Sequence, residues 1–259
     1  MSLFEVKAVS QDYGWGPVLH NINFHLSEGE GFGIIGPNGS GKSTLIRIIS
    51  GLLVPSQGEV RFRGKPVHTY RKKELARQIA VLEQEGTALL PFSVKEVVAM
   101  GRYPWLKPFS DTNSEDERII EDALKSLGLW EVREQPVNTL SGGQRQLVSL
   151  ARAMAQQPSV LILDEPTTYL DIGHQALVMR HVRRWHLEQG ITVIMILHDL
   201  NLAGQYCDKL LLMEKGQIRA CGKASEILVE GTISSVYRTG LIKVNHPLLG
   251  VPQFLLAGM

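Results

Sequence analysis

The chain has 259 residues, a formal net charge of +1 and 44% hydrophobic residues. This length can hold one large domain or two small ones with a proper core. The near-zero net charge gives no electrostatic case for nucleic acid as the main partner. No apolar run reaches the ~20 residues that a membrane-spanning helix needs, and we expect no secretory signal at the N-terminus.

Strands and a helix are predicted in the first fifty residues. Residues 4–9 and 19–26 have the pattern of strands, the second through its alternation of apolar and polar side chains. The apolar run 31–35 predicts a third strand that leads into a glycine-rich loop, and residues 44–49 then continue as a helix that ends near Gly51. A strand, a glycine-rich loop and a helix in this order form the context of a phosphate-binding loop.

The pattern becomes helical between residues 86 and 157. Ser93 and Ser114 are each followed three residues later by glutamate, which is the capping-box pattern of a helix start. Gly128 is expected to end the helix that starts at Ser114. We therefore predict an inserted helical subdomain in this part of the chain.

Buried strands return after the helical stretch. Residues 160–163 and 191–197 are predicted to be apolar strands, and residues 174–187 a helix between them. Apolar strands that alternate with helices indicate a parallel sheet covered on both faces. The predicted fold class is therefore α/β with a parallel sheet. The tail from Leu210 on predicts short strands and a small helix at residues 225–229.

The glycine-rich loop has the composition of a phosphate site. It reads Gly36-Pro37-Asn38-Gly39-Ser40-Gly41-Lys42-Ser43-Thr44. Its backbone N–H groups can converge on phosphate oxygens because glycine allows a close approach, and the helix that follows favours negative charge. Lys42 is expected to reach the β- and γ-phosphates, and the Ser43 hydroxyl to hold Mg²⁺. The alternative is a glycine-rich turn with an exposed lysine, which the flanking strand and helix make a poorer explanation.

Two adjacent carboxylates end the apolar strand 160–163. They lie at the C-terminal edge of a sheet strand, where open α/β sheets bind ligands. Asp164 is expected to hold Mg²⁺, directly or through water, and Glu165 to orient and polarise the attacking water. The alternative, two acidic caps on a loop, fits less well because unpaired charges at the end of a buried strand are costly.

His198 and Gln84 also stand at the ends of predicted strands. His198 follows the strand 191–197 and is expected to hydrogen-bond a γ-phosphate, although a lone histidine at such a position is more often structural. Gln84 follows the strand-like residues 79–82, where a glutamine can contact Mg²⁺ or water. By itself Gln84 would be an ordinary polar loop residue.

Three histidines share the predicted helix 174–187, and they receive no functional role. They are His174, His181 and His186. No carboxylate or cysteine accompanies them in the pattern of a metal site, so we expect them to be structural.

The stretch Leu140–Gln144, with sequence Leu-Ser-Gly-Gly-Gln, is the most specific motif of the chain. Ser141 and Gln144 have capping-box spacing, so part of the motif is helix initiation. Capping does not explain Gly142 and Gly143 in the first turn, where glycine is a poor helix former. We interpret these glycines as a second phosphate-binding helix N-terminus, with N–H groups open to an anion.

Together these motifs resemble those of the ATP-binding subunits of ATP-binding-cassette (ABC) transporters, in family order. Residues 36–44 resemble the Walker A loop, Gln84 the Q-loop, residues 140–144 the signature, residues 160–165 the Walker B strand with its catalytic glutamate, residues 168–171 the D-loop, and His198 the switch histidine. Tyr13 is similar to the aromatic residue that stacks on adenine, with Trp15 as a nearby competitor. The resemblance covers nearly the whole chain.

The resemblance implies an ATPase with ATP and Mg²⁺ as cofactors. The implied catalytic residues are Glu165, His198, Gln84 and Lys42. The implied nucleotide contacts are Tyr13, residues 36–44, Ser141, Gly142, Gly143, Gln144 and Asp171, and the implied Mg²⁺ contacts are Ser43, Gln84 and Asp164. The implied fold is one P-loop NTPase domain over residues 1–259, with the core and an N-terminal antiparallel β-subdomain in residues 1–85 and 158–259 and the helical subdomain in residues 86–157.

In this family two ATPase subunits face head to tail, with ATP between the Walker A loop of one and the signature of the other. The resemblance therefore implies a homodimer, docked on transmembrane permease subunits at the cytoplasmic face of the membrane. A substrate-binding protein would act on it indirectly, and no nucleic acid is expected.

Three segments look like those of importers for iron–siderophore, haem or cobalamin-type chelates. They are Phe92–Val98, Gly101–Trp105 and the tail around His246. Another substrate class, an exporter and a soluble ABC ATPase stay open as alternatives. A repair-type ATPase would need long coiled coils, and no heptad stretch is present. A nucleotide-binding regulator without turnover would not need both Glu165 and His198.

Overall fold

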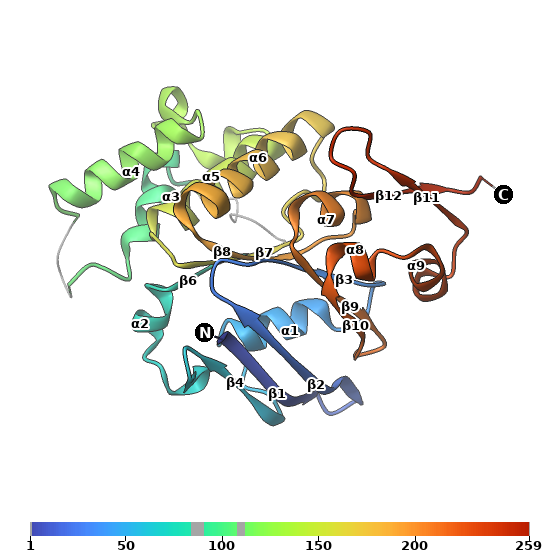
Figure 1. The fold of residues 1–259 in the computed structure, drawn as a ribbon. Helices are drawn as coiled ribbons and strands as arrows, with labels where there is room; N and C mark the ends of the chain where they lie inside the picture. The colour runs from blue at the N-terminus through green and yellow to red at the C-terminus, as the bar shows by residue number, and fades with distance from the viewer. Residues whose placement is uncertain (1, 84–90, 108–111, 259) are drawn as a thin grey trace. The chain divides into compact units, whose positions relative to one another are not determined.

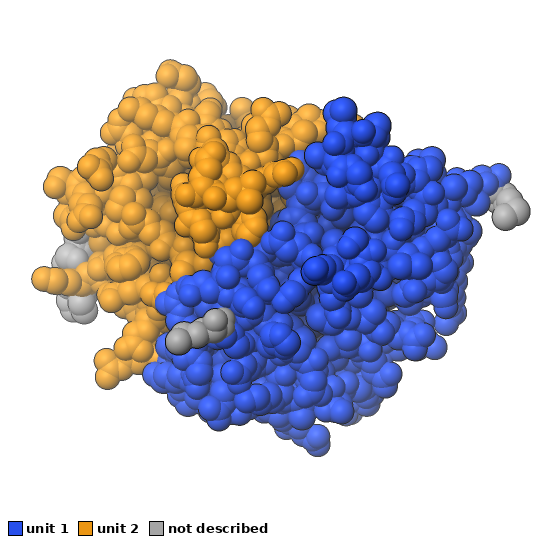
Figure 2. Space-filling view, in the orientation of Figure 1, with its two compact units in different colours: residues 1–70, 192–259 blue, residues 71–191 orange. Residues whose placement is uncertain are grey.

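The computed structural model describes residues 2–83, 91–107 and 112–258. These residues form two compact units, which Figure 2 shows in different colours. The first unit contains residues 1–70 and 192–259, and the second contains residues 71–191. None of the helices in the described ranges combines the length and the apolarity needed to cross a bilayer.

The first unit begins with an antiparallel sheet (Figure 1). Its strands lie in the order β2-β1-β4-β5 and span Pro17–Ser27, Ser2–Asp12, Gln57–Phe62 and Lys65–Pro66. The strands predicted at residues 4–9 and 19–26 are confirmed, and the register pairs Phe4 with both Leu26 and Phe62. No pattern predicts β4 and β5, which have only 6 and 2 residues.

Parallel strands form the buried part of the first unit. Strand β3 (Gly31–Ile35) pairs in parallel with both β8 (Thr192–Ile196) and β9 (Lys209–Glu214), and β10 (Gln217–Lys223) is antiparallel to β9. Every residue of β3 and β8 is buried, as expected of apolar strands covered on both faces. The strands predicted from these apolar runs are confirmed.

Short helices and a terminal hairpin complete the first unit. They span Lys42–Ile49 (α1), Val67–Thr69 (η1), Leu200–Tyr206 (α7), Ala224–Ile227 (α8), Glu230–Tyr237 (α9), Leu241–Asn245 (β11) and Pro252–Leu256 (β12). The small helix predicted at residues 225–229 is confirmed as α8, and α9 follows it as a helix that was not predicted. Glycine, threonine and two serines in α9 have low helix propensity, so no pattern predicts this helix.

The second unit contains two parallel strands and a set of helices among its described residues. The strands are Ile79–Leu82 (β6) and Val160–Asp164 (β7), and the helices are Lys72–Ala76 (α2), Val94–Ala99 (α3), Met100–Arg102 (η2), Ser114–Ser126 (α4), Trp130–Val132 (η3), Val137–Thr139 (η4), Gly142–Ala155 (α5) and Ile172–Gln189 (α6). The strand predicted at residues 160–163 and the helix predicted at 174–187 are confirmed. Gly128, with φ of 70°, follows the end of α4 as predicted. The boundary of a helical subdomain at residues 86–157 stays a prediction.

Capping boxes start α3 and α4 in the second unit. The Ser93 hydroxyl accepts the N–H of Glu96 at 3.2 Å and the Glu96 carboxylate accepts the N–H of Ser93 at 2.7 Å, which confirms the predicted box. At α4 the predicted cap, Ser114, is wrong. The side chain of Asn113 accepts the N–H of Asp116 at 2.9 Å, and the Asp116 carboxylate accepts the N–H of Asn113 at 3.2 Å. Asparagine and serine are equally good caps, so the pattern cannot choose between neighbours.

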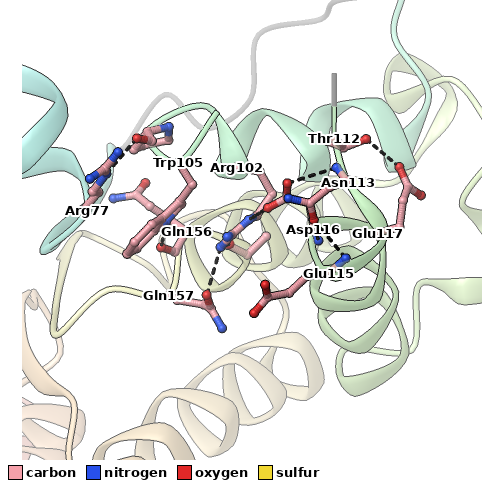
Figure 3. Close-up of polar contacts among 12 residues, drawn as sticks. Arg77, Arg102, Trp105, Thr112, Asn113, Glu115, Asp116, Glu117, Gln156 and Gln157 are labelled. Atoms are coloured by element: carbon pink, nitrogen blue, oxygen red, sulfur yellow. Dashed lines mark hydrogen bonds and ion pairs between the residues drawn. The ribbon is translucent and has the colours of Figure 1, made fainter. Parts of the chain in front are cut away.

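A buried arginine ties η2 to the C-terminal end of α5 (Figure 3). The Arg102 guanidinium donates to the Asp116 carboxylate at 2.7 Å, and each side chain is only 6% exposed. Arg102 also donates to the carbonyl of Ala155 at 2.8 Å and to the side-chain oxygen of Gln157 at 3.0 Å. At Gly101 a Cβ would lie 2.2 Å from a carbonyl oxygen of α5. These contacts fix the C-terminal end of α5 against η2.

Trp105 extends the same network (Figure 3). Its ring N–H donates to the carbonyl of Gln156 at 2.9 Å, and the Arg77 guanidinium lies 5.1 Å from the ring centre. Arg77 also donates to the carbonyl of Pro104 at 2.9 Å. The segment Gly101–Trp105, which suggested an importer subgroup, therefore has a structural role in packing the second unit.

We expect Asp116→Ala to lower the free energy of unfolding by about 3–5 kcal/mol, because it leaves the Arg102 charge buried and unpaired. Burial raises the pKa of the Asp116 carboxyl, but the hydrogen bonds from Arg102 and the N–H of Asn113 outweigh burial and lower it. The stabilisation is therefore complete above the ordinary aspartate pKa of about 3.9 and is lost as the pH falls through the lowered pKa. Urea denaturation at pH 7 and pH 3 measures both effects.

Glu117→Ala is the matched control for this prediction. Glu117 pairs with Lys95 at 2.9 Å on the surface, where the two side chains are 45% and 42% exposed. An exposed pair contributes at most about 1 kcal/mol. Equal losses for the two variants would show that the Arg102–Asp116 pair does not stabilise the second unit beyond a surface contact.

Candidate functional site

The phosphate loop, residues 36–44, connects β3 to α1 within the first unit (Figure 1). Gly36, Gly39 and Gly41 have φ angles of 147°, 75° and 93°, which side chains rarely allow. The loop therefore takes a turn that only glycine at these positions permits, as the sequence predicts. The helix begins at Lys42, so its first N–H groups lie in the loop.

Neighbouring groups lie close to both ends of this loop. A Cβ at Gly36 would lie 2.2 Å from the carbonyl oxygen of Met213, and one at Gly41 would lie 2.6 Å from a methyl carbon of Leu19. A Cβ at Gly39 would meet no atom within 4 Å. The loop is therefore packed at its two ends and open in the middle, where a ligand can approach the backbone.

The Lys42 side chain lies inside the loop and not in solvent. It is 6% exposed, and its ammonium donates to the carbonyl of Gly36 at 2.8 Å and to that of Pro37 at 3.0 Å. The alternative of an exposed lysine on a glycine-rich turn is therefore wrong. A cation held by loop carbonyls is in place to meet an anion that enters the loop.

A cavity of about 290 Å³ borders the same loop. Asn38, Ser40, Tyr237 and Arg238 contribute to its lining. The hydroxyls of Ser40 and Tyr237 are the two buried side-chain polar atoms without a hydrogen-bond partner among the residues that the structure describes. Burial raises the pKa of Tyr237 to about 12 although the backbone of Gly36 acts in the opposite direction. A polar cavity of this size has room for ordered water.

Tyr13, the candidate adenine contact, lies in a turn after β1. The Asp12 carboxylate accepts the N–H of Gly14 at 2.7 Å and that of Gly16 at 3.3 Å, which shapes the turn. Tyr13 is 38% exposed, and the competing Trp15 is 89% exposed. Both rings are accessible, and the assignment to Tyr13 stays a prediction.

The two carboxylates lie at the C-terminal end of β7 in the second unit. Asp164 ends the strand and is 8% exposed, so its carboxylate lies at the margin of the core. Glu165 has a φ of 54°, and its carboxylate accepts the Thr168 hydroxyl at 3.0 Å. Tyr169 also has positive φ, 63°, and is 94% exposed. Such left-handed residues other than glycine concentrate at functional sites.

The signature, residues 140–144, starts α5 as predicted. The Ser141 hydroxyl accepts the N–H of Gln144 at 3.2 Å, and the Gln144 side chain accepts the N–H of Ser141 at 3.1 Å. This reciprocal pair confirms that Ser141 and Gln144 serve helix initiation.

The two signature glycines differ in their surroundings. A Cβ at Gly142 would meet only the far end of Arg145, at 4.0 Å. A Cβ at Gly143 would lie 2.3 Å from the imidazole of His174. The interpretation that both glycines require an anion is therefore corrected: Gly143 already has a reason within the chain, and Gly142 alone lacks one.

Asp171 and His174 form a pair that the sequence analysis did not predict. The Asp171 carboxylate accepts the backbone N–H of His174 at 2.8 Å and contacts its ring Nδ1 at 2.8 Å. Both hydrogen bonds lower the pKa of Asp171, and the one from the backbone N–H has the larger effect. Asp171 is the N-cap of α6, and His174 follows it three residues later. This spacing is the signal in the sequence from which the pair could have been predicted. His174 therefore has the carboxylate companion that the sequence pattern did not reveal.

Two predicted residues remain to be placed. His198 follows β8 in the first unit, next to Asp199, which caps α7 by accepting the N–H of Asn201 at 2.7 Å. Gln84 lies outside the described residues. Their roles at the γ-phosphate and at Mg²⁺ stay predictions.

The chain matches the family described as "ABC transporter" over residues 19–168, more than half of its 259 residues. The matched span includes the phosphate loop, the signature and both carboxylates of the β7 end.

Three relatives carry the same kind of description. The ferric enterobactin transport ATP-binding protein FepC of Escherichia coli is 38% identical over 93% of this chain and 89% of its own length. The hemin import ATP-binding protein HmuV of Pseudomonas putida is 38% identical over 98% of this chain and 99% of its own length. The uncharacterized ABC transporter ATP-binding protein YvrA of Bacillus subtilis is 36% identical over 97% of this chain, but the chain spans only 57% of YvrA.

Two solved structures share the fold. One is an inward-facing metal-chelate type ABC transporter, with a TM-score of 0.86 and 26% identity over 99% of this chain and 98% of that one. The other is the dimeric bacterial ABC transporter cassette MJ0796, with a TM-score of 0.76 and 29% identity over 85% of this chain and 98% of that one. The chain therefore belongs to the ABC transporter family, as an ATP-binding and ATP-hydrolysing protein with the α/β fold of the ABC ATPases.

Proposed function

We propose that this protein is the ATPase subunit of an importer for a metal chelate, such as an iron–siderophore, haem or a cobalamin-type compound. The observation that carries the proposal is the phosphate loop with the Lys42 ammonium inside it. A buried cation among backbone N–H groups is a site for a polyphosphate and has little use in a structural turn. The names of FepC and HmuV and the metal-chelate type of the similar transporter support the substrate class.

The proposed roles follow from the chemistry of each group. The loop backbone and Lys42 bind the β- and γ-phosphates, and Tyr13 stacks on the adenine. Glu165 orients and polarises the attacking water, and His198 hydrogen-bonds the γ-phosphate. Gln84 contacts Mg²⁺ or the attacking water.

Mg²⁺ fits the groups that the chain offers. Ser43 supplies a hydroxyl in the first turn of α1 and Asp164 a carboxylate at the end of β7, and such hard oxygen ligands suit this ion. No group of three or more His, Cys, Asp or Glu side chains forms a metal cage in the described ranges. When bound, Mg²⁺ would neutralise charge on the phosphates.

The signature supports a dimer in which each subunit contacts the ATP of the other. Ser141 is the N-cap of α5, and its capping box satisfies the hydroxyl. At Gly142, next to it, there is open space where a side chain would be. An uncovered helix N-terminus with exposed N–H groups suits an anion. The chain's own phosphate loop already serves one nucleotide, so we assign Ser141, Gly142, Gly143, Gln144 and Asp171 to the partner's nucleotide. The dimeric MJ0796 cassette supports this arrangement.

The dimer is proposed to dock on transmembrane permease subunits at the cytoplasmic face of the membrane, with a substrate-binding protein acting through the permease. Closure on ATP and opening after hydrolysis would move the permease, with the difference in ATP affinity between the two states as the source of work.

Glu165→Gln is expected to keep ATP binding, to lose turnover and to accumulate an ATP-bound dimer, because the amide cannot polarise the attacking water. Steady-state ATPase assays and size-exclusion chromatography with ATP measure both effects. Glu121→Gln, the same change at an exposed residue of α4 that pairs with Lys125, is the control. Full turnover in Glu165→Gln would refute the role of this glutamate.

Ser141→Arg is expected to block hydrolysis while a single subunit still binds ATP, because a long cation fills the space in front of the signature. Ser141→Ala is the control, since it removes the same cap at a cost of about 1 kcal/mol but leaves the space open. Binding of a fluorescent ATP analogue and ATPase rates distinguish the two. Loss of nucleotide binding by the Ser141→Arg monomer would contradict the placement of the signature at the partner's nucleotide.

Co-purification with the membrane partner tests the proposed transport role. We expect the ATPase rate of the purified transporter to rise when a substrate-binding protein loaded with a ferric siderophore or haem is added, and to stay at its basal value with the unloaded protein. Stimulation by a binding protein for a different substrate class, and by none for a metal chelate, would overturn the proposed class.

A further inference from the structure

His174, in the segment that follows β7, lies against the signature. A Cβ placed on Gly143 would lie 2.3 Å from Cδ2, 2.6 Å from Cγ and 2.7 Å from Nε2 of the His174 ring. The imidazole therefore covers one face of the Gly143 backbone. As long as the ring stays there, only glycine fits at position 143.

Asp171 holds the ring in this position. Its carboxylate accepts the backbone N–H of His174 with one oxygen and faces Nδ1 with the other, both at 2.8 Å. A carboxylate only accepts hydrogen bonds, so Nδ1 carries the proton and donates to it. One residue thus fixes both the backbone and the ring of His174, and the Nε2 edge remains turned to Gly143. Nε2 has no hydrogen-bond partner among the residues that the structure describes.

A second contact joins the same two segments. The side-chain amide of Gln146, three residues along α5 from Gly143, donates to the carbonyl of Pro166 at 3.1 Å. Residues three apart lie on one face of a helix, so this face of α5 contacts residues 165–174 at two places. Within that segment the Thr168 hydroxyl donates to the Glu165 carboxylate at 3.0 Å.

We propose that His174 is a positioning residue, which couples the signature to the segment that carries Glu165 and Asp171. The ring acts as a fixed spacer: it sets the position of the first turn of α5 relative to residues 165–171. This inference rests on the proposed function, in which that turn contacts the partner's ATP. A displacement of Gly143 by the partner's nucleotide would then be transmitted through His174 to Asp171 and on to the hydrolytic segment.

A double-mutant cycle tests the coupling. Gly143→Ala forces its methyl into the ring and is expected to lower kcat about a hundredfold, as small displacements at a catalytic site do. His174→Ala removes the spacer and is expected to lower kcat about tenfold. In the His174→Ala background the methyl of Gly143→Ala has space, so the part of the loss due to the clash is expected to disappear and the remaining loss to be no larger than that of Gly142→Ala. Helix propensity does not account for the loss in Gly143→Ala, because alanine is the better helix former.

Gly142→Ala is the matched control for the cycle. Gly142 is also in the first turn of α5, but its Cβ would not meet His174. The losses from Gly142→Ala and His174→Ala are therefore expected to multiply. Multiplying losses for the Gly143 pair as well would overturn the proposal, since they would show that the ring and the signature act independently.

His174→Asn separates positioning from simple helix capping. The asparagine amide can donate to Asp171 in place of Nδ1, but no ring then reaches Gly143. We expect His174→Asn to match His174→Ala in kcat, to keep the unfolding midpoint of the unsubstituted protein, and to leave binding of an ATP analogue to the monomer unchanged. Wild-type kcat in His174→Asn would overturn the positioning role and leave His174 only as a partner of the Asp171 cap.

Failure of the proposed function and failure of the coupling through His174 give different results. If the unsubstituted protein, alone and with its membrane partner, does not hydrolyse ATP, the proposed function fails and the role of His174 fails with it. If it hydrolyses ATP and the Gly143 cycle shows independent effects, only the coupling through His174 is refuted.

Discussion

Close backbone packing around the phosphate loop is the constraint on which the first unit depends. Gly36 and Gly41 have no space for a side chain, so the loop can sit against its neighbours and turn its carbonyls toward the Lys42 ammonium. Strand β3 runs into the loop and α1 runs out of it, so the pairing of β3 with β8 and β9 determines where the loop lies. The N–H of Gly216, in the β9–β10 turn, donates to the carbonyl of Ser40 at 3.2 Å and anchors it from another side.

In the second unit, α5 is held at its two ends by interactions of different strength. Its 14 residues span about 21 Å. At the C-terminal end the buried Arg102 network resists displacement, because breaking a buried ion pair costs several kcal/mol. At the N-terminal end Gly143 meets His174 through van der Waals contacts, each worth only tenths of a kcal/mol. We therefore expect a ligand to shift the signature end, which the Gln146–Pro166 hydrogen bond also holds, more easily than the Arg102 end.

The elements that depend on neighbouring residues in the sequence could be predicted, and the contacts between residues far apart in the sequence could not. The phosphate loop, the capping boxes at Ser93 and Ser141 and the apolar strands depend on neighbours in sequence, so their patterns are visible there. The choice of Asn113 over Ser114 depends on small differences between two good caps. The contact between Gly143 and His174 joins residues far apart in sequence, and no periodicity or motif encodes it. Residue type likewise does not predict the left-handed backbone of Glu165.

The two glycines of the signature have different physical reasons. Two glycines in the first turn of a helix suggested an anion, because neither helps the helix to form. The imidazole of His174 now accounts for Gly143 without any ligand. Gly142 has no such neighbour, and Ser141 beside it is already satisfied by its capping box. The case for a second subunit's nucleotide at this helix start therefore rests on Gly142, and Gly143 serves the internal contact that holds the signature in place to receive it.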